Sequence, residues 1–294
     1  MRNEIISPIC TPAEAKRRFE GLRPTHEWAR AEGFTFVKDT ACYRTPESKL
    51  VSMLNRDFWT EEEQQRHWEI FKNIKGDPSN RPEIFGKRAE VAMNRVRMDG
   101  SLSPRVQAPA ELARLTGGQA AIVGPYRYNA AAGSEARCEL TPFTVEHPEV
   151  YFEVVRMGHR ITEFFQAVLP EEYARQKEYV DKVPENMKIP GTVHTACYGL
   201  HNVSTAIHKD EFDFAGATGC ITTCGSFEGN QLVLPEFRLA FDIQPDAVFF
   251  GDFHSWHGNL PRFSGGERTS LVWFVRKDMH KCGEVYGAVP LHRP

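Results

Sequence analysis

Two histidines and an aspartate have a spacing that would let them share one metal ion. His208 and Asp210 are separated by a single residue, and His257 follows far downstream. Alternate residues of an extended strand point to the same face, so His208 and Asp210 can reach one ion from a strand end. Two imidazoles and one carboxylate can bind one face of an Fe(II) ion and leave three positions open for a co-substrate and oxygen. The pattern therefore predicts an iron site.

The distal histidine has an alternative in the same segment. Phe249–Asn259 follows an apolar run and contains both His254 and His257. We favour His257 as the ligand, because the small Gly258 would let the chain turn while the ring points inward. His254 then lies beside the site or on the surface, and either histidine remains a candidate. A single histidine on a strand is more often a packed residue than a ligand.

An arginine and a serine follow the distal histidine on the next predicted strand. Arg268 and Ser270 are two residues apart, so their side chains face the same way. A guanidinium in a dry interior needs an anion, and a carboxylate pairs with it through two hydrogen bonds. The alternative is an ion pair with a neighbouring Asp or Glu. Because Arg268 follows a predicted metal-binding histidine, we favour the carboxylate of a co-substrate over this ion pair.

The elements that must position these residues are short strands. From residue 191 onward, β-like runs alternate with Gly, Pro, Asn and Asp turns, which is typical of a double-sheet barrel or jelly roll. The predicted strands cover residues 192–198, 218–223, 231–234, 247–250 and 269–275.

The first third of the chain has helix signals instead. Thr11-Pro12-Ala13-Glu14 and Thr60-Glu61-Glu62-Glu63 each combine an N-cap with a capping-box glutamate. Residues 87–98 have a helical apolar pattern, residues 34–37 are short enough to form a strand, and residues 76–82 and 99–109 resemble loops.

A long helix is predicted in the middle of the chain, from Pro148 to Val168, followed by a more polar helix from Pro170. These patterns together predict an α+β fold. A double-stranded β-helix (jelly-roll) core would occupy residues 111–294, and a mostly helical region, residues 1–110, would pack on it as part of one compact unit.

Composition limits the possible function classes. The 294 residues are 41% hydrophobic and 26% charged, as in ordinary globular proteins. No apolar run approaches the roughly 20 residues of a membrane span, and the first residues lack the apolar core of a secretory signal. We therefore expect a cytoplasmic or nuclear protein that does not bind membranes.

The formal net charge of −3 does not by itself indicate nucleic-acid binding. Residues 1–110 carry 19 Lys and Arg against 16 Asp and Glu, whereas residues 111–294 carry 17 against 23. A mildly basic N-terminal region could face an anionic partner, but we favour a solvated surface of mixed charge as the explanation.

The seven cysteines show no paired spacing. Cys220 and Cys224 are near neighbours in an apolar run, but no second Cys or His pair accompanies them, so a zinc site has little support. We expect reduced and mostly buried thiols.

The order His-x-Asp, His, Arg-x-Ser resembles the Fe(II)/2-oxoglutarate-dependent dioxygenases. Residues 232–246, 254–261 and 266–272 resemble more specifically the TET/JBP branch, whose members oxidise the methyl group of 5-methylcytosine or thymine in nucleic acid. The resemblance covers residues 191–276. One departure is Pro245-Asp246-Ala247, where the branch usually has a glycine after the proline.

The resemblance implies that 2-oxoglutarate and O2 bind an Fe(II) ion held by His208, Asp210 and His257. Arg268, with Ser270, would hold the distal carboxylate of 2-oxoglutarate. The implied reaction is oxidation of a C–H bond, most specifically the methyl group of 5-methylcytosine or thymine in DNA or RNA. The alternative is hydroxylation of a small molecule or a protein side chain. Asn202, Tyr198 and His254 are candidates for orienting the ligands.

A base in duplex DNA would have to be flipped into the pocket and its backbone held by cations. The densest basic stretch consists of Arg81, Lys87, Arg88, Arg95, Arg97 and Arg105. Tyr126 and Tyr128, on either side of Arg127, could stack on a base. For each individual residue we favour the alternative, a solvated helix face and a loop with packed tyrosines.

Overall fold

The chain forms two units whose segments alternate along the sequence. The computed structural model describes residues 2–72, 74, 119–127, 138–263 and 265–284. One unit comprises residues 1–121, 200–210 and 221–270, and the other comprises residues 122–199, 211–220 and 271–294. All five predicted site residues belong to the first unit.

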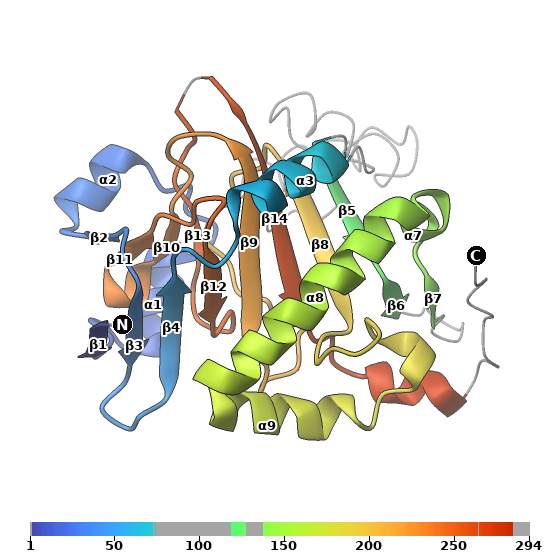
Figure 1. Cartoon of the computed structure of the whole chain (residues 1–294). Helices are drawn as coiled ribbons and strands as arrows, with labels where there is room; N and C mark the ends of the chain where they lie inside the picture. Colours follow the sequence, from blue (N-terminus) through green and yellow to red (C-terminus); the bar gives the residue numbers. More distant parts are fainter. Residues whose placement is uncertain (1, 73, 75–118, 128–137, 264, 285–294) are drawn as a thin grey trace, which may run out of the picture. The chain divides into compact units, whose positions relative to one another are not determined.

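The large sheet of the first unit joins strands from distant parts of the sequence (Figure 1). β1 (Arg2–Ile5) pairs in parallel with β3 (Ala41–Arg44), and β3 pairs antiparallel with β4 (Leu50–Asn55). β4 pairs antiparallel with β12 (Val248–Gly251), and the order continues through β9 (Gly219–Ser226) to β14 (Glu267–Phe274). N-terminal strands thus extend the sheet that carries Arg268 and Ser270.

A smaller sheet contains four short strands. β10 (Leu232–Leu234) lies between β13 (Gly258–Asn259) and β11 (Leu239–Phe241), antiparallel to both, and β2 (Thr35–Val37) is parallel to β11. A 3-10 turn, η2 (Pro235–Phe237), connects β10 to β11. The fully buried Phe241 ring contacts Tyr43 at 5.8 Å and Phe249 at 5.0 Å between centroids. Aromatic side chains therefore join the two sheets.

Two helices of the first unit, α1 (Pro12–Phe19) and α3 (Glu61–Phe71), begin where the sequence predicts, and a third, α2 (His26–Ala31), is not among the predicted helices. α1 and α3 have complete capping boxes at Thr11 and Thr60, and α2 is capped by Thr25. Phe19 of α1 and Ala29 of α2 share one buried cluster with Val233 and Ala240 of the small sheet. α1 and α2 therefore bury their apolar faces against the small sheet.

The mostly helical N-terminal region stays a prediction. Its described residues contain α1 to α3 and also β1 to β4, which form parts of both sheets. Of these strands, only β2 is predicted from the sequence, and the pair of antiparallel neighbours β3 and β4 is missed. The predicted helix at 87–98, the loops at 76–82 and 99–109, and the boundary near residue 110 lie outside the described residues.

Helices dominate the second unit. α8 (Pro148–Val168) has the predicted bounds, and α9 (Pro170–Val180) packs against it after Leu169 (Figure 1). No helix in the described part of the chain is long and apolar enough to cross a membrane. The remaining elements are β5 (Gln119–Val123), β6 (Pro125–Arg127), β7 (Cys138–Leu140), α7 (Pro142–Glu146), η1 (Glu185–Met187), β8 (Ala196–His201) and η3 (Met279–Glu284).

β8 begins later than the strand predicted from residue 192. The Thr192 hydroxyl donates to the carbonyl of Ile189 at 2.9 Å and accepts from the backbone N–H of His194 at 3.1 Å. A threonine side chain that bonds its own neighbourhood in this way favours a turn over an extended ladder.

The expectation that all seven cysteines are reduced is also corrected. Cys138 and Cys282 form a disulfide across a sequence separation of 144 residues, a distance at which spacing carries no signal. The other five form no disulfide, and among them Cys42, Cys197, Cys220 and Cys224 are buried. Burial raises the pKa of Cys224 to about 12, so this thiol is protonated at pH 7.

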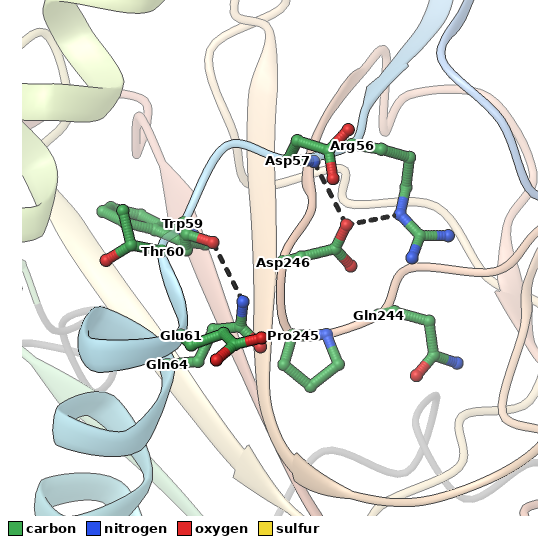
Figure 2. A pocket seen from close by; sticks show the side chains of 9 residues that line it. All are labelled: Arg56, Asp57, Trp59, Thr60, Glu61, Gln64, Gln244, Pro245 and Asp246. Carbon is green, nitrogen blue, oxygen red and sulfur yellow. Dashed lines mark hydrogen bonds and ion pairs between the residues drawn. The ribbon is translucent and has the colours of Figure 1, made fainter.

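The turn between β11 and β12 is clamped to the end of β4 through Asp246 (Figure 2). The Asp246 carboxylate accepts from Arg56 Nε at 2.8 Å and from the Asp57 N–H at 3.1 Å. Burial would raise the pKa of Asp246, but these hydrogen bonds outweigh it and lower the pKa below its ordinary value. The clamp forms one wall of an open pocket of about 550 Å³.

A histidine buried in the second unit should make stability depend on pH. His194 is fully buried, and neither ring nitrogen has a hydrogen-bond partner. Burial lowers its pKa from 6.5 to about 3, so the folded state binds this proton less readily than the unfolded state. Above pH 6.5 the ring is neutral in both the folded and the unfolded state, so His194 does not affect the free energy of unfolding. That free energy falls as the pH drops from 6.5 towards 3.

We therefore predict that His194→Phe, which keeps an aromatic ring beside Phe165, flattens the pH dependence in this window. Urea unfolding measured at pH 7.5 and at pH 5 would test this. The variant should lose less stability than the natural protein between the two pH values, and an equal loss in both proteins would contradict the assignment.

Candidate metal centre

The two predicted metal-binding histidines are held together by their own backbones. His208 N–H donates to the His257 carbonyl at 2.8 Å, and His257 N–H donates to the His208 carbonyl at 3.0 Å. This isolated antiparallel bridge, rather than a long strand, fixes their register. Asp210 N–H in turn donates to the Phe253 carbonyl at 3.0 Å, so all three predicted ligands are carried on one small ladder.

Hydrogen bonds also fix how the two rings face. His208 Nδ1 lies 2.8 Å from the Ala206 carbonyl, and His257 Nδ1 lies 3.0 Å from the Ser255 carbonyl. A carbonyl can only accept, so each Nδ1 carries the proton and each Nε2 keeps its lone pair. The two Nε2 atoms lie 3.7 Å from different oxygens of Asp210. Backbone carbonyls that orient imidazoles in this way are typical of metal sites.

The donor set fits one divalent cation. One ligand atom from each of His208, Asp210 and His257 lies within 4.8 Å of the other two. Burial, with a smaller effect from His208, lowers the pKa of His257 to about 4, so its ring is neutral at pH 7. Among the described residues, His257 and not His254 belongs to this group, and His254 instead lies beside Asp252 with its Nδ1 3.5 Å from the carboxylate.

Gly258 matters for a different reason from the predicted one. It lies in β13, and a Cβ at this position would come within 3.0 Å of the Ala206 carbonyl and of Ile207. The glycine therefore permits the close approach of the two segments that carry His208 and His257. It does not serve to turn the chain.

Arg268 and Ser270 lie side by side on β14, as predicted. Both are buried, and an Arg268 Nη1 hydrogen bond reaches the Ser270 hydroxyl. The guanidinium lies 5.2 Å above the Phe227 ring, and its Nε has no hydrogen-bond partner. No carboxylate in the described part of the chain pairs with it. Burial lowers the pKa of Arg268 to about 10, so it remains a cation at pH 7.

A buried and unpaired guanidinium is costly unless an anion completes it. Arg268 therefore fits a carboxylate-bearing ligand better than the alternative of an internal ion pair.

Among the described residues, the candidates for orienting the ligands and for stacking on a base do not gather at the metal-binding group. Asn202 contacts Arg268 rather than the metal-binding histidines. Tyr198 belongs to the second unit, where it packs on a cluster that includes Tyr126. Tyr126 is itself buried beneath the Arg276 guanidinium, 4.4 Å from its ring. Tyr128 and the basic residues between 81 and 105 lie outside the described residues.

Sequence reasoning did not identify Asp252. Its carboxylate accepts from the backbone N–H of His254 at 3.0 Å and pairs with Lys49 at 2.6 Å, which shapes the loop leading to His257. An Asp directly after the apolar β12, with a turn two residues later, is the signal that could have revealed it.

Comparisons with known proteins identify the family of this chain. A family profile, Tet_JBP, described as the oxygenase domain of the 2OGFeDO superfamily, matches residues 122–277. The chain is 29% identical to thymine dioxygenase JBP1 of Crithidia fasciculata over 163 residues, and 30% identical to JBP1 of Leishmania infantum over 168 residues. Each match covers 54% of this chain but only 20% of the relative.

A solved structure has a similar fold. NgTET1 in complex with 5mC DNA aligns with a TM-score of 0.54 at 11% identity, covering 91% of this chain and 92% of that chain. The likeness supports a mixed α+β fold with large sheets. Since the matching profile spans more than half of the sequence and includes all five site residues, the chain belongs to the Tet_JBP family of oxygenases in the 2-oxoglutarate- and Fe(II)-dependent dioxygenase superfamily.

Proposed function

We propose that His208, Asp210 and His257 bind Fe(II). The observation that carries this proposal is the direction of the two imidazoles, whose Nδ1 atoms are tied to backbone carbonyls while both Nε2 atoms face Asp210. Three ligands on one side of the ion leave the opposite side open, as non-haem iron oxygenases require. The two sheets around the site would form the double-stranded β-helix that the family implies.

Arg268 and Ser270 would bind the distal carboxylate of 2-oxoglutarate. The buried guanidinium supplies positive charge, and the adjacent hydroxyl supplies a further donor. With 2-oxoglutarate and O2, the bound iron would supply the oxidising power for a C–H bond, with succinate and CO2 as co-products. The residues of this chain hold the ligands, fix their orientation and exclude water.

The substrate that we propose is the methyl group of 5-methylcytosine or thymine in nucleic acid. The two JBP1 relatives are thymine dioxygenases, and the structural neighbour NgTET1 was solved in complex with 5mC DNA. Both likenesses support a modified or methylated pyrimidine base as the substrate. A nucleic-acid substrate would be compatible with a nuclear or a cytoplasmic enzyme.

A cation–aromatic cluster in the second unit provides further support. Arg276 lies over Tyr126 and over Phe212, at 4.4 and 5.4 Å, and Lys277 lies over Phe212 at 4.9 Å. Phe212 follows the proposed ligand Asp210 by two residues and is 43% exposed. In this cluster Phe212 and Lys277 are exposed, whereas Tyr126 and Arg276 are buried. An exposed aromatic ring beside an exposed cation is suited to stacking a base and neutralising a phosphate.

The alternative is a small-molecule or protein side-chain hydroxylase with the same iron chemistry. The net charge of −3, and the acidic excess in residues 111–294, favour it because a phosphate backbone attracts basic proteins. Substrate tests separate the two proposals.

The ligand assignment predicts that His257→Ala and Asp210→Ala each weaken metal binding by more than about 100-fold, because a tridentate site becomes bidentate. Calorimetric titration with Co(II), which does not turn over with oxygen, measures this directly. His254→Ala is the matched control and should bind the metal as the natural protein does. Normal binding by His257→Ala, with weak binding by His254→Ala, would reverse the assignment.

For Arg268 we predict opposite effects on binding and stability. Arg268→Met should weaken 2-oxoglutarate binding on the order of 100-fold, since it removes a desolvated charge partner. The same change should not lower the free energy of unfolding without ligand, because it removes a buried unpaired cation. Arg268→Lys keeps the charge but loses the planar guanidinium group. Its affinity for 2-oxoglutarate should lie between those of the natural protein and Arg268→Met. A destabilised Arg268→Met protein that still binds 2-oxoglutarate would indicate a structural arginine.

The substrate proposal predicts oxidised nucleosides after incubation with methylated DNA, Fe(II), ascorbate and 2-oxoglutarate. Mass spectrometry should detect the oxidation of 5-methylcytosine or thymine, and the His257→Ala protein should give none. Unchanged nucleosides, together with succinate release on a small molecule or peptide, would instead support the alternative.

A further inference from the structure

Asn202 makes two hydrogen bonds with the peptide groups of Arg268. Its backbone N–H donates to the Arg268 carbonyl at 2.8 Å, and its side-chain Oδ1 accepts from the Arg268 N–H at 2.9 Å. One residue thereby binds both polar groups of the Arg268 backbone at the start of β14. Because the guanidinium is carried at the end of a long side chain, the position of this backbone limits where the cation can reach.

The direction of the Asn202 amide is fixed by a chain of hydrogen bonds. Thr269 Oγ1 donates to the Phe71 carbonyl at 3.2 Å, so it accepts from His201 Nδ1 at 2.9 Å. His201 Nε2 is then an acceptor, and it receives the Asn202 Nδ2–H at 3.0 Å. With Nδ2 used in this way, Oδ1 must point to Arg268.

A second arginine shares the same amide oxygen. Arg262 Nη1 donates to Asn202 Oδ1 at 2.7 Å, and the charge of Arg262 contributes to lowering the pKa of Arg268. Asn202 Oδ1 accepts from the Arg262 guanidinium and from the Arg268 backbone N–H, and because this oxygen is neutral it cancels neither positive charge. In the described part of the chain, no carboxylate pairs with either guanidinium.

The backbone explains why this position holds an asparagine. Asn202 has a left-handed φ of 55°, a conformation that Asn and Gly adopt more readily than other residues. Asparagine is the residue that combines this conformation with a neutral acceptor and a donor.

We propose that Asn202 is a positioning residue for 2-oxoglutarate, which sets Arg268 in place through its backbone while leaving the positive charge available to the dianion. The inference rests on the proposed role of Arg268. It assigns no direct contact between Asn202 and the co-substrate.

The test is calorimetric titration of 2-oxoglutarate into the Co(II)-loaded protein. Asn202→Gly keeps the left-handed backbone and removes the amide, so it should weaken binding about tenfold. Asn202→Asp keeps the acceptor but adds a negative charge between the two arginines, so it should also weaken binding. Co(II) affinity should stay unchanged in both variants, because the amide does not contact His208, Asp210 or His257.

Asn230→Gly is the matched control. Asn230 also has a left-handed φ, 57°, and its amide bonds Ser204 rather than Arg268. This variant should bind 2-oxoglutarate as the natural protein does, even if it unfolds more easily. Natural-like binding by Asn202→Gly, or weakening of equal size in Asn230→Gly, would overturn the inference alone. Failure of the natural protein to bind 2-oxoglutarate would overturn the proposed function with it.

Discussion

The pairing of His208 with His257 through two backbone hydrogen bonds is the constraint on which the metal centre depends. Each imidazole is turned by a carbonyl two residues earlier, at Ala206 and at Ser255. The two segments approach closely because Gly258 has no side chain. Peptide groups therefore set the geometry of the proposed metal site.

The second centre depends on an electrostatic cost. A buried guanidinium without a carboxylate is unfavourable in the folded chain. Arg268 remains charged nonetheless, because burial lowers its pKa only to about 10. The chain supports it with the Ser270 hydroxyl and the Phe227 ring, neither of which neutralises it. Within the described residues the guanidinium therefore lacks an anionic partner, and a bound carboxylate would offset the free energy lost by burying the cation.

Local signals in the sequence predicted the parts that local chemistry determines. The capping boxes at Thr11 and Thr60 start their helices, and the apolar stripe of residues 148–168 forms one helix. The ligand atoms of His208, Asp210 and His257 also lie together, but a backbone bridge between distant segments brings His257 there. The missed features depend on contacts between distant segments. Examples are the Cys138–Cys282 disulfide, the pairing of β4 with β12, and the reason for Gly258. No local pattern encodes which strand will lie beside another.

The one departure from the family pattern can be explained from such a contact. Asp246 stands where the branch usually has glycine, and its φ is not left-handed, so this backbone does not require a glycine. Its carboxylate instead joins the turn before β12 to Arg56 and Asp57 at the end of β4 (Figure 2). Asp246 thereby fixes the turn before β12, and β12 leads directly into the loop that carries His257. A sequence change at a family position thus has a structural function here and leaves the proposed ligands unaltered.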